Sequence, residues 1–266
     1  MTEVQQRCVS FGRALITTAD LDPLYVMLVG AQLPRETLGR FILAYSMFYH
    51  AGVSAYLAST GNDFWEECRH ADREKWPRGT ERRHYRGAIS HNSIEACASI
   101  GMPEDVLDVI YPMSEVQSCL GAPLSFGQVF KGAQALSGFG PWIAFKLADL
   151  ADRTGYFPVD FSDCHLSIYR DPVKGAALWR YGDQDAAIKP HEVGEVCEEI
   201  RVAIGPLPAP PLYDRPINIQ EVETVLCKFK SHNNGHYPIG KDTREITHGL
   251  DGWGILAHQL AACPLL

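Results

Sequence analysis

The segment Leu136–Ala148, with the sequence LSGFGPWIAFKLA, constrains the fold of this chain more than any other. Its two glycines flank one apolar residue, which allows a tight turn whose amide groups point outward. A helix that starts at Pro141 brings the positive end of its dipole to the same place. We therefore predict a helix-hairpin-helix over about residues 125–152 whose turn binds the phosphate backbone of a nucleic acid.

The predicted nucleic-acid contacts of this hairpin surround its two glycines. They are Ser137, Gly138, Phe139, Gly140 and Trp142. A turn of this kind can also hold a monovalent cation between its carbonyl groups, and nothing else in the chain indicates a cofactor. An ordinary turn between two helices, capped by glycine, fits the Gly-X-Gly pattern equally well. Leu136 before the turn and Ile143 after it favour the hairpin, because they lie where its two helices would pack together.

Apolar residues recur at three- and four-residue spacing along much of the chain, which indicates a mostly α fold. Helices are predicted over residues 23–60, 92–100, 103–111, 191–204 and 217–230, and a polar loop then leads to a terminal helix. Residues 161–189 are predicted to be irregular. The proline-rich run 205–216 predicts a stiff connector between two packed lobes of one domain, before a C-terminal helical segment over about 217–266.

The net charge of -8 excludes a surface that binds polyanions all over, so a nucleic-acid site has to be local. The eight cysteines are scattered without a CxxC pair, and we predict no metal site. No stretch approaches the roughly 20 consecutive apolar residues of a membrane span. The first residues, MTEVQQRC, lack the order of a signal peptide, and we expect a cytoplasmic protein that does not contact a membrane.

Positive charge is concentrated between Arg69 and Arg86. Several guanidinium groups close together favour a site for a phosphoryl group, because each can make bidentate contacts with phosphate oxygens. The predicted phosphate ligands here are Arg78, Arg82, Arg83 and Arg86. A charge run is more often a solvated helix face, but the sequence Pro-Arg-Gly-Thr-Glu at residues 77–81 indicates a shaped loop with Thr80 as a helix cap.

A second group of basic residues lies in the segment 228–242. Lys230, His232 and His236 are predicted to contact DNA, and Lys241 to bind phosphate. The two histidines have the spacing of zinc ligands only on a helix, and the Asn-Asn-Gly at 233–235 predicts a turn instead. An ordinary polar surface loop is the alternative.

The hairpin and the residues that follow it resemble the helix-hairpin-helix DNA glycosylases. In that superfamily a catalytic aspartate follows the hairpin at a nearly fixed interval, often after a Phe-Pro element, and Asp160 in Tyr156–Asp160 occupies the matching position. Asp163 is a rival for this role, and a loop or helix-capping aspartate is the structural alternative. Pro141 and Trp142 stand where bifunctional glycosylases carry a lysine nucleophile, and Lys146 comes one turn too late.

Together these segments resemble the alpha-glutamyl/putrescinyl thymine pyrophosphorylases, or amino acid:DNA transferases, of bacteriophages with hypermodified thymine. The resemblance covers Arg40–Tyr45, Pro77–Gly87, the hairpin with Asp160, and Tyr237–Asp242. It implies an enzyme of the infected cell's cytoplasm that replaces the phosphate or pyrophosphate on a 5-hydroxymethyluracil base in double-stranded DNA by an amine. The amine is typically that of an amino acid.

The residues suit such a reaction. A base inside a duplex is out of reach, so the enzyme would flip it out of the stack. Asp160 would then act as the base or orient the amine, the arginines would neutralise the leaving group, and His84 would protonate it.

Two other classes of protein remain open. A monofunctional DNA glycosylase would use Asp160 to support cleavage of the N-glycosidic bond, and a non-catalytic module would use the hairpin only to bind DNA. Arginines facing Asp160 favour transfer, an aromatic pocket without arginines favours glycosylase action, and a blocked cleft favours docking.

Overall fold

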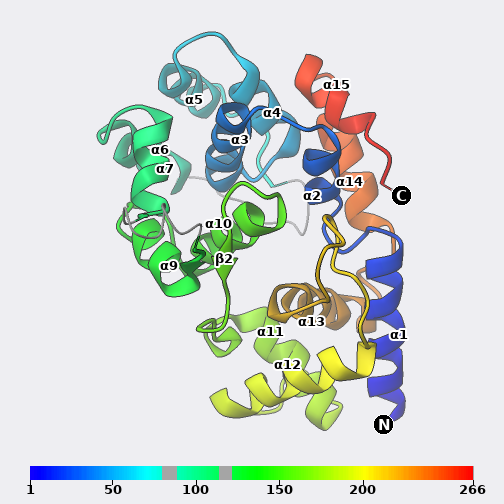
Figure 1. Ribbon diagram of the computed structural model, residues 1–266. Helices are drawn as coiled ribbons and strands as arrows, with labels where there is room; N and C mark the ends of the chain where they lie inside the picture. The colour runs from blue at the N-terminus through cyan, green and yellow to red at the C-terminus, as the bar shows by residue number, and fades with distance from the viewer. Residues whose placement is uncertain (80–88, 114–121, 266) are drawn as a thin grey trace. The chain divides into compact units, whose positions relative to one another are not determined.

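The computed structural model describes residues 1–79, 89–113 and 122–265, which form two compact units (Figure 1). The first unit consists mainly of Met1–Pro23 and Asp163–Asp242, and the second of Leu24–Ser162 and Thr243–Pro264. The chain thus leaves the first unit after its N-terminal helix and returns to it after the hairpin. The described part is mostly helical, as the apolar periodicity predicts.

The first unit is built from four α-helices and a 3-10 turn among its described residues. They are α1 (Glu3–Thr17), η1 (Leu166–Ile168), α11 (Arg170–Tyr181), α12 (Pro190–Ile204) and α13 (Ile219–Asn233). Helix α1 packs on α12 and α13 so closely that a Cβ atom added at Gly12 would lie 2.8 Å from Ile204 and 3.2 Å from Val225. A Cβ atom at Gly175 would lie 2.5 Å from the Leu226 carbonyl oxygen, so α11 and α13 are in backbone contact.

The prediction of an irregular segment over 161–189 was wrong, because α11 occupies its centre. Half of the buried residues of this helix are small, namely Gly175, Ala176 and Ala177; the others are Pro172, Leu178 and Trp179. Small residues give a weak apolar signal in the sequence, yet they allow the close approach to α13. Gly182 ends the helix in the left-handed conformation (φ 73°).

The proline-rich run 205–216 lies inside the first unit and is not an extended connector. The amide of Ala209 donates to the Arg215 carbonyl at 2.8 Å, and the amide of Ile217 donates to the Leu207 carbonyl at 3.1 Å. These bonds fold the run back on itself between α12 and α13.

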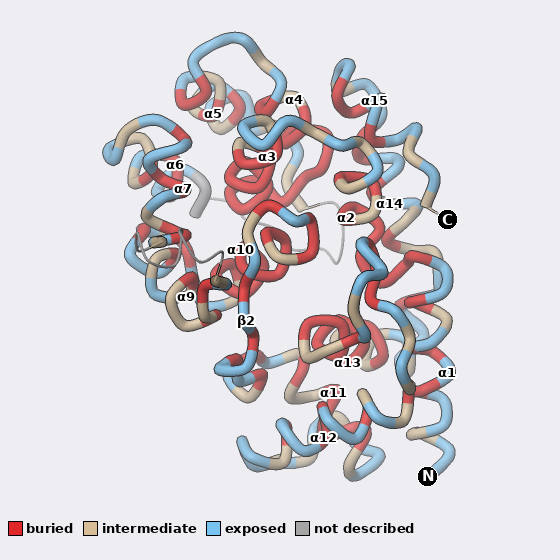
Figure 2. Tube along the Cα trace, in the orientation of Figure 1, coloured by how far each residue is buried: buried red, intermediate tan, exposed pale blue. Residues whose placement is uncertain are grey.

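The second unit contains the segment that was predicted to form the hairpin. Its described elements are α2 (Pro23–Gly30), α3 (Arg35–Phe48), α4 (Ala51–Ser59), α5 (Phe64–Arg73), α6 (Ile89–Ala98), α7 (Pro103–Ile110), β1 (Leu124–Ser125), α9 (Phe126–Gln134), α10 (Pro141–Arg153), β2 (Val159–Asp160), α14 (Lys241–Leu250) and α15 (Ile255–Ala261). Figure 2 shows α3, α4 and α10 as its most continuously buried helices. None of the helices in the described ranges is long and apolar enough to span a membrane.

The predicted helix over 23–60 is three helices, and the predicted terminal helix is two, α14 and α15. Helices α9 and α10 lie on either side of the turn in the predicted hairpin. A two-residue parallel pairing closes this structure, since Leu124 pairs with Val159 and Ser125 with Asp160. The residue before α9 is thereby bound to the segment after α10, and this fixes the position of Asp160 relative to the hairpin.

Candidate functional site

The turn of the hairpin has the backbone that its glycines predict. Gly138 has a φ of 83°, a conformation that favours glycine, and Gly140 is the N-cap of α10 with φ -80° and ψ 176°. Gly140 has no side chain to cap the helix, and its surface is exposed. The N-terminus of α10 is therefore suited to an anion, although the binding of a nucleic acid there stays a prediction.

The other predicted contacts of the hairpin differ in how accessible they are. Ser137 is exposed and Trp142 is half-buried, whereas Phe139 is only 4% exposed. The ring of Phe139 belongs to the core, so this residue can meet a nucleic acid only through its backbone.

Trp142 packs on a strained residue that follows α3. Its ring lies 5.0 Å from the ring of Tyr49, edge to face. Tyr49 adopts the left-handed conformation (φ 51°, ψ 40°), which costs a residue with a Cβ atom on the order of 1 kcal/mol or more. We refer to Phe48, Tyr49 and His50, which connect α3 to α4, as the 48–50 corner. Backbone strain of this kind is frequent at functional sites.

The beginning of the arginine block meets the same corner. The amide of Gly79 donates to the Phe48 carbonyl at 3.2 Å, and the Arg78 guanidinium lies 5.5 Å from the Phe48 ring. Arg78 also forms an ion pair with Asp72 and is 8% exposed. Arg78 and Trp142 come from two of the predicted segments, and they contact the adjacent residues Phe48 and Tyr49. Arg82, Arg83, His84 and Arg86 lie outside the described residues.

His50 completes the corner as the N-cap of α4. Its Nδ1 accepts a hydrogen bond from the Val53 amide at 3.2 Å, and its ring lies 5.7 Å from the ring of Trp253. Burial lowers the pKa of His50 to about 4, so the imidazole is neutral at pH 7. Sequence analysis missed this residue because the apolar pattern runs on through residues 23–60 without marking the break between α3 and α4.

We expect His50 to make stability depend on pH. Its pKa is about 4 in the folded protein and 6.5 in the unfolded chain. Between these values the unfolded chain binds more protons, so stability falls as the pH drops from 6.5 toward 4 and is constant below that. The loss from pH 7 to pH 5 is about 2 kcal/mol. Urea unfolding at both pH values should show a smaller loss in His50→Asn, which retains a capping oxygen but cannot titrate. An equal loss in both proteins would show that His50 is not responsible.

Asp160 lies on β2 with an exposed side chain. Its carboxylate accepts hydrogen bonds from the amide and the hydroxyl of Ser162, both at 2.9 Å. Asp163 is exposed as well and belongs to the first unit. Burial therefore does not decide between the two aspartates, whereas the pairing of β1 with β2 ties only Asp160 to the hairpin.

Lys146 belongs to a buried cluster on α10. Its ammonium lies 3.2 Å from the Asp149 carboxylate, which also accepts a hydrogen bond from the Tyr25 hydroxyl at 2.9 Å. Arg153 lies 3.7 Å from the same carboxylate. Lys146 thus stabilises the helix that follows the turn, and we assign it no role as a nucleophile.

Comparison with known proteins gives the family. The family described as amino acid:DNA transferase matches residues 13–236. The chain is 38% identical over 271 residues to a glycinyltransferase of Pseudomonas phage PaMx11, an alignment that covers 91% of this chain and 89% of that protein. It is 29% identical over 262 residues to a putrescinyltransferase of Delftia phage PhiW-14, with 94% and 80% covered.

The chain belongs to the amino acid:DNA transferase family. The resemblance inferred from the hairpin, Asp160 and the basic segments is thereby confirmed. Membership makes the protein an enzyme that acts on DNA, with an amino acid or another amine as the second substrate. The matched range includes the hairpin and Asp160, and it ends immediately before Tyr237.

The basic residues near the end of this amino acid:DNA transferase are held by internal contacts. Lys230 pairs with Asp171, and Lys241 donates to the His236 carbonyl at 3.1 Å. His232 contacts the Tyr237 carbonyl oxygen through Nδ1 at 2.8 Å, while His236 is exposed. Helix α13 ends at Asn233, so the two histidines do not share a helical face. Their contacts with DNA stay a prediction.

The most buried cation of this segment, Lys228, was not predicted to have a role. Its ammonium lies 2.6 Å from Asp242 and donates to the carbonyl groups of Asp20 at 2.5 Å and Leu21 at 2.8 Å. Asp20 in turn accepts hydrogen bonds from the Tyr237 hydroxyl and the Gly240 amide. The motif at 237–242 therefore has a structural function in the transferase, since it binds α13 to the turn after α1.

Proposed function

We propose that the protein replaces the phosphate or pyrophosphate on a 5-hydroxymethyluracil base of phage DNA by the amine of an amino acid. The amine nitrogen attacks the exocyclic methylene carbon, and the bond from that carbon to the phosphoryl oxygen breaks. One amine proton passes to Asp160, and the leaving phosphate departs with the electron pair of the broken bond. The reaction would take place in the cytoplasm of the infected cell, on a base flipped out of the duplex.

The 48–50 corner is the observation that supports this proposal most. Its residues contact Trp142 of the predicted hairpin and Arg78 of the arginine block. Both lie in the unit that also contains Asp160. A DNA-backbone contact and a carboxylate are two elements that the reaction requires, and Arg78, whose charge is balanced by Asp72, holds the start of the arginine block at the same corner. His84 and the arginines at positions 82, 83 and 86, which follow Arg78 in the sequence, are assigned to the leaving group.

Mass spectrometry of nucleosides tests the proposal. The protein is incubated with duplex DNA that carries phosphorylated or pyrophosphorylated 5-hydroxymethyluracil and with a pool of amino acids. Amine transfer yields a nucleoside whose mass exceeds that of 5-hydroxymethyl-deoxyuridine by the mass of the amino acid less one water. A glycosylase would release the free base and leave an abasic site, and a docking module would leave the DNA unchanged. Parallel reactions with EDTA, and with potassium exchanged for sodium, examine the expectation of no cofactor beyond a monovalent cation at the turn.

We expect Gly140→Val to weaken DNA binding by about tenfold, because the side chain obstructs the amide groups proposed to hold a phosphate. Valine fits the backbone at this position, where nothing lies within 4 Å of an added Cβ atom. Gly138→Val is less informative, since its φ of 83° makes any Cβ atom costly. Fluorescence anisotropy with a labelled duplex measures the affinity, and a thermal melt verifies the fold. Unchanged affinity in folded Gly140→Val would contradict the hairpin assignment.

A further inference from the structure

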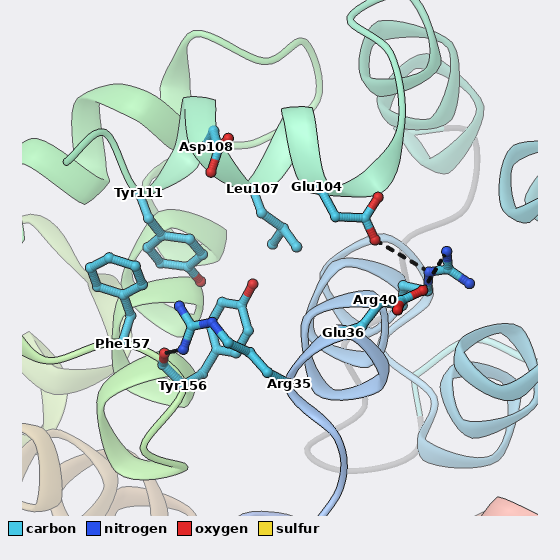
Figure 3. A pocket seen from close by; sticks show the side chains of 9 residues that line it. All are labelled: Arg35, Glu36, Arg40, Glu104, Leu107, Asp108, Tyr111, Tyr156 and Phe157. Carbon is cyan, nitrogen blue, oxygen red and sulfur yellow. Dashed lines mark hydrogen bonds and ion pairs between the residues drawn. The ribbon is translucent and has the colours of Figure 1, made fainter. Parts of the chain in front are cut away.

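The second unit contains a cavity of about 550 Å³ whose lining residues have been given no role so far. It lies between the start of α3, helix α7 and the segment Tyr156–Phe157 (Figure 3). Aromatic rings of Tyr111, Tyr156 and Phe157 form one wall, and charged side chains of α3 and α7 form the others. A cavity of this size with a few convergent charges is typical of sites for small molecules.

Three of the charged side chains on the cavity wall, Arg40, Glu36 and Glu104, form one group. Arg40 lies 2.8 Å from Glu36 and 3.5 Å from Glu104, so this arginine is shared by two carboxylates. The trio as a whole retains one negative charge. This net negative charge favours a ligand that brings a cationic group to this side of the cavity.

Arg35 is a cation without an acidic partner among the described residues. Its guanidinium lies 4.4 Å from the centre of the Tyr156 ring and 5.5 Å from that of Phe157, and it donates to the Tyr156 carbonyl. Two rings and one carbonyl thus hold the group in a fixed position while its charge is left for a ligand. A guanidinium held in this way is suited to a carboxylate, which it can bind through two parallel hydrogen bonds.

Asp108 presents the opposite charge from the α7 side of the cavity (Figure 3). Its carboxylate is exposed and forms no ion pair within the described part of the chain. Both charges act on the same phenol: burial raises the pKa of Tyr156, Arg35 lowers it, and Asp108 and Glu104 raise it. The cavity therefore offers a positive and a negative group to one ligand.

We propose that this cavity binds the amino-acid co-substrate, with the carboxylate of the amino acid on Arg35 and its amino group on Asp108. This inference rests on the proposed function for the identity of the reaction, but the binding itself does not require DNA. Phe157 precedes Asp160 by three residues, so their Cα atoms are at most roughly 11 Å apart. The segment that carries the proposed base thus begins at the wall of the cavity.

Glycine and methylamine are the probes, since methylamine is glycine without its carboxylate. Saturation-transfer NMR titrations without DNA give the dissociation constant of each for the wild type and for Arg35→Gln. We expect Arg35→Gln to weaken glycine binding by about tenfold or more and to leave methylamine binding unchanged. Asp108→Asn should weaken the binding of both. Arg201→Gln, which removes an exposed arginine paired with Glu198 in the first unit, serves as the matched control.

The results separate a binding role from a structural one. If Arg35→Gln weakened glycine and methylamine equally, or left glycine unchanged, the assignment of Arg35 would be overturned. The DNA reaction then gives a second readout, in which Arg35→Gln raises the KM for glycine with little change in kcat. Transfer to DNA with an unaltered KM in both cavity variants would refute this site while leaving the proposed function intact. Glycine binding to the cavity without any transfer to DNA would support this site and contradict the proposed function.

Discussion

Asp160→Asn is expected to reduce turnover by about 100-fold or more, which is the usual contribution of a general base. The affinity for DNA should remain close to that of the wild type, because a carboxylate repels phosphate if it has any effect. The one side-chain oxygen of asparagine can still accept the hydrogen bond from the Ser162 amide, and its NH2 group can donate to the Ser162 hydroxyl in place of the second bond. The loop that carries residue 160 is thereby preserved. Single-turnover kinetics and anisotropy on the same duplex measure the two quantities separately.

Asp163→Asn is the matched control for this experiment. The residue is three positions away and equally exposed, yet it takes no part in the pairing that closes the hairpin. Full activity of Asp160→Asn together with inactive Asp163→Asn would transfer the catalytic role to Asp163. Ser162→Ala is expected to cause a small loss only, since it removes one of the two hydrogen bonds to Asp160.

The turn between α9 and α10 was the most predictable part of the molecule, because its signals are local. Gly138 adopts the left-handed conformation that favours glycine, Pro141 begins α10, Ile143 is buried on α10, and Leu136 is buried in the turn after α9. The pairing of β1 with β2 holds Asp160 next to the start of α9, and this contact is not local in the sequence.

The 48–50 corner could not be read from the sequence, because its features depend on tertiary contacts. Tyr49 adopts a left-handed conformation that is uncommon for tyrosine, and packing against Trp142 accompanies it. His50 caps a helix through Nδ1, a function that the residue type alone does not indicate. The same limit applies to Arg35, whose importance depends on the aromatic rings that surround it.

The segment 228–242 shows a different limit of sequence analysis. Its lysines and histidines indicated a polar surface. Lys228, however, is buried, with 1% of its surface exposed. A lysine is almost never buried without a partner, but the partner here is Asp242, and the other ligands are carbonyl groups of residues 20 and 21. Only the fold of the first unit brings these groups together. We therefore expect the Lys228–Asp242 ion pair to contribute strongly to the free energy of unfolding.

Lys228→Met is expected to lower the free energy of unfolding by about 3–5 kcal/mol, the usual cost of removing one partner from a buried ion pair. Methionine fills a similar volume, so the loss reports the missing ammonium group. The Asp242 carboxylate, which is fully buried, and the two carbonyl groups at 20 and 21 all lose their bond to it. Urea unfolding followed by circular dichroism measures the change.

Lys230→Met gives the comparison that isolates burial. This lysine lies on the same helix and pairs with Asp171, but its side chain is 18% exposed and that of Asp171 is 43% exposed. A partly solvated pair contributes about 1 kcal/mol or less, so Lys230→Met should have a small effect. Adding Asp242→Asn to Lys228→Met should restore part of the stability, because the buried group that faced the ammonium is then neutral. Equal losses from the two lysine substitutions would show that the Lys228 ion pair does not stabilise the first unit.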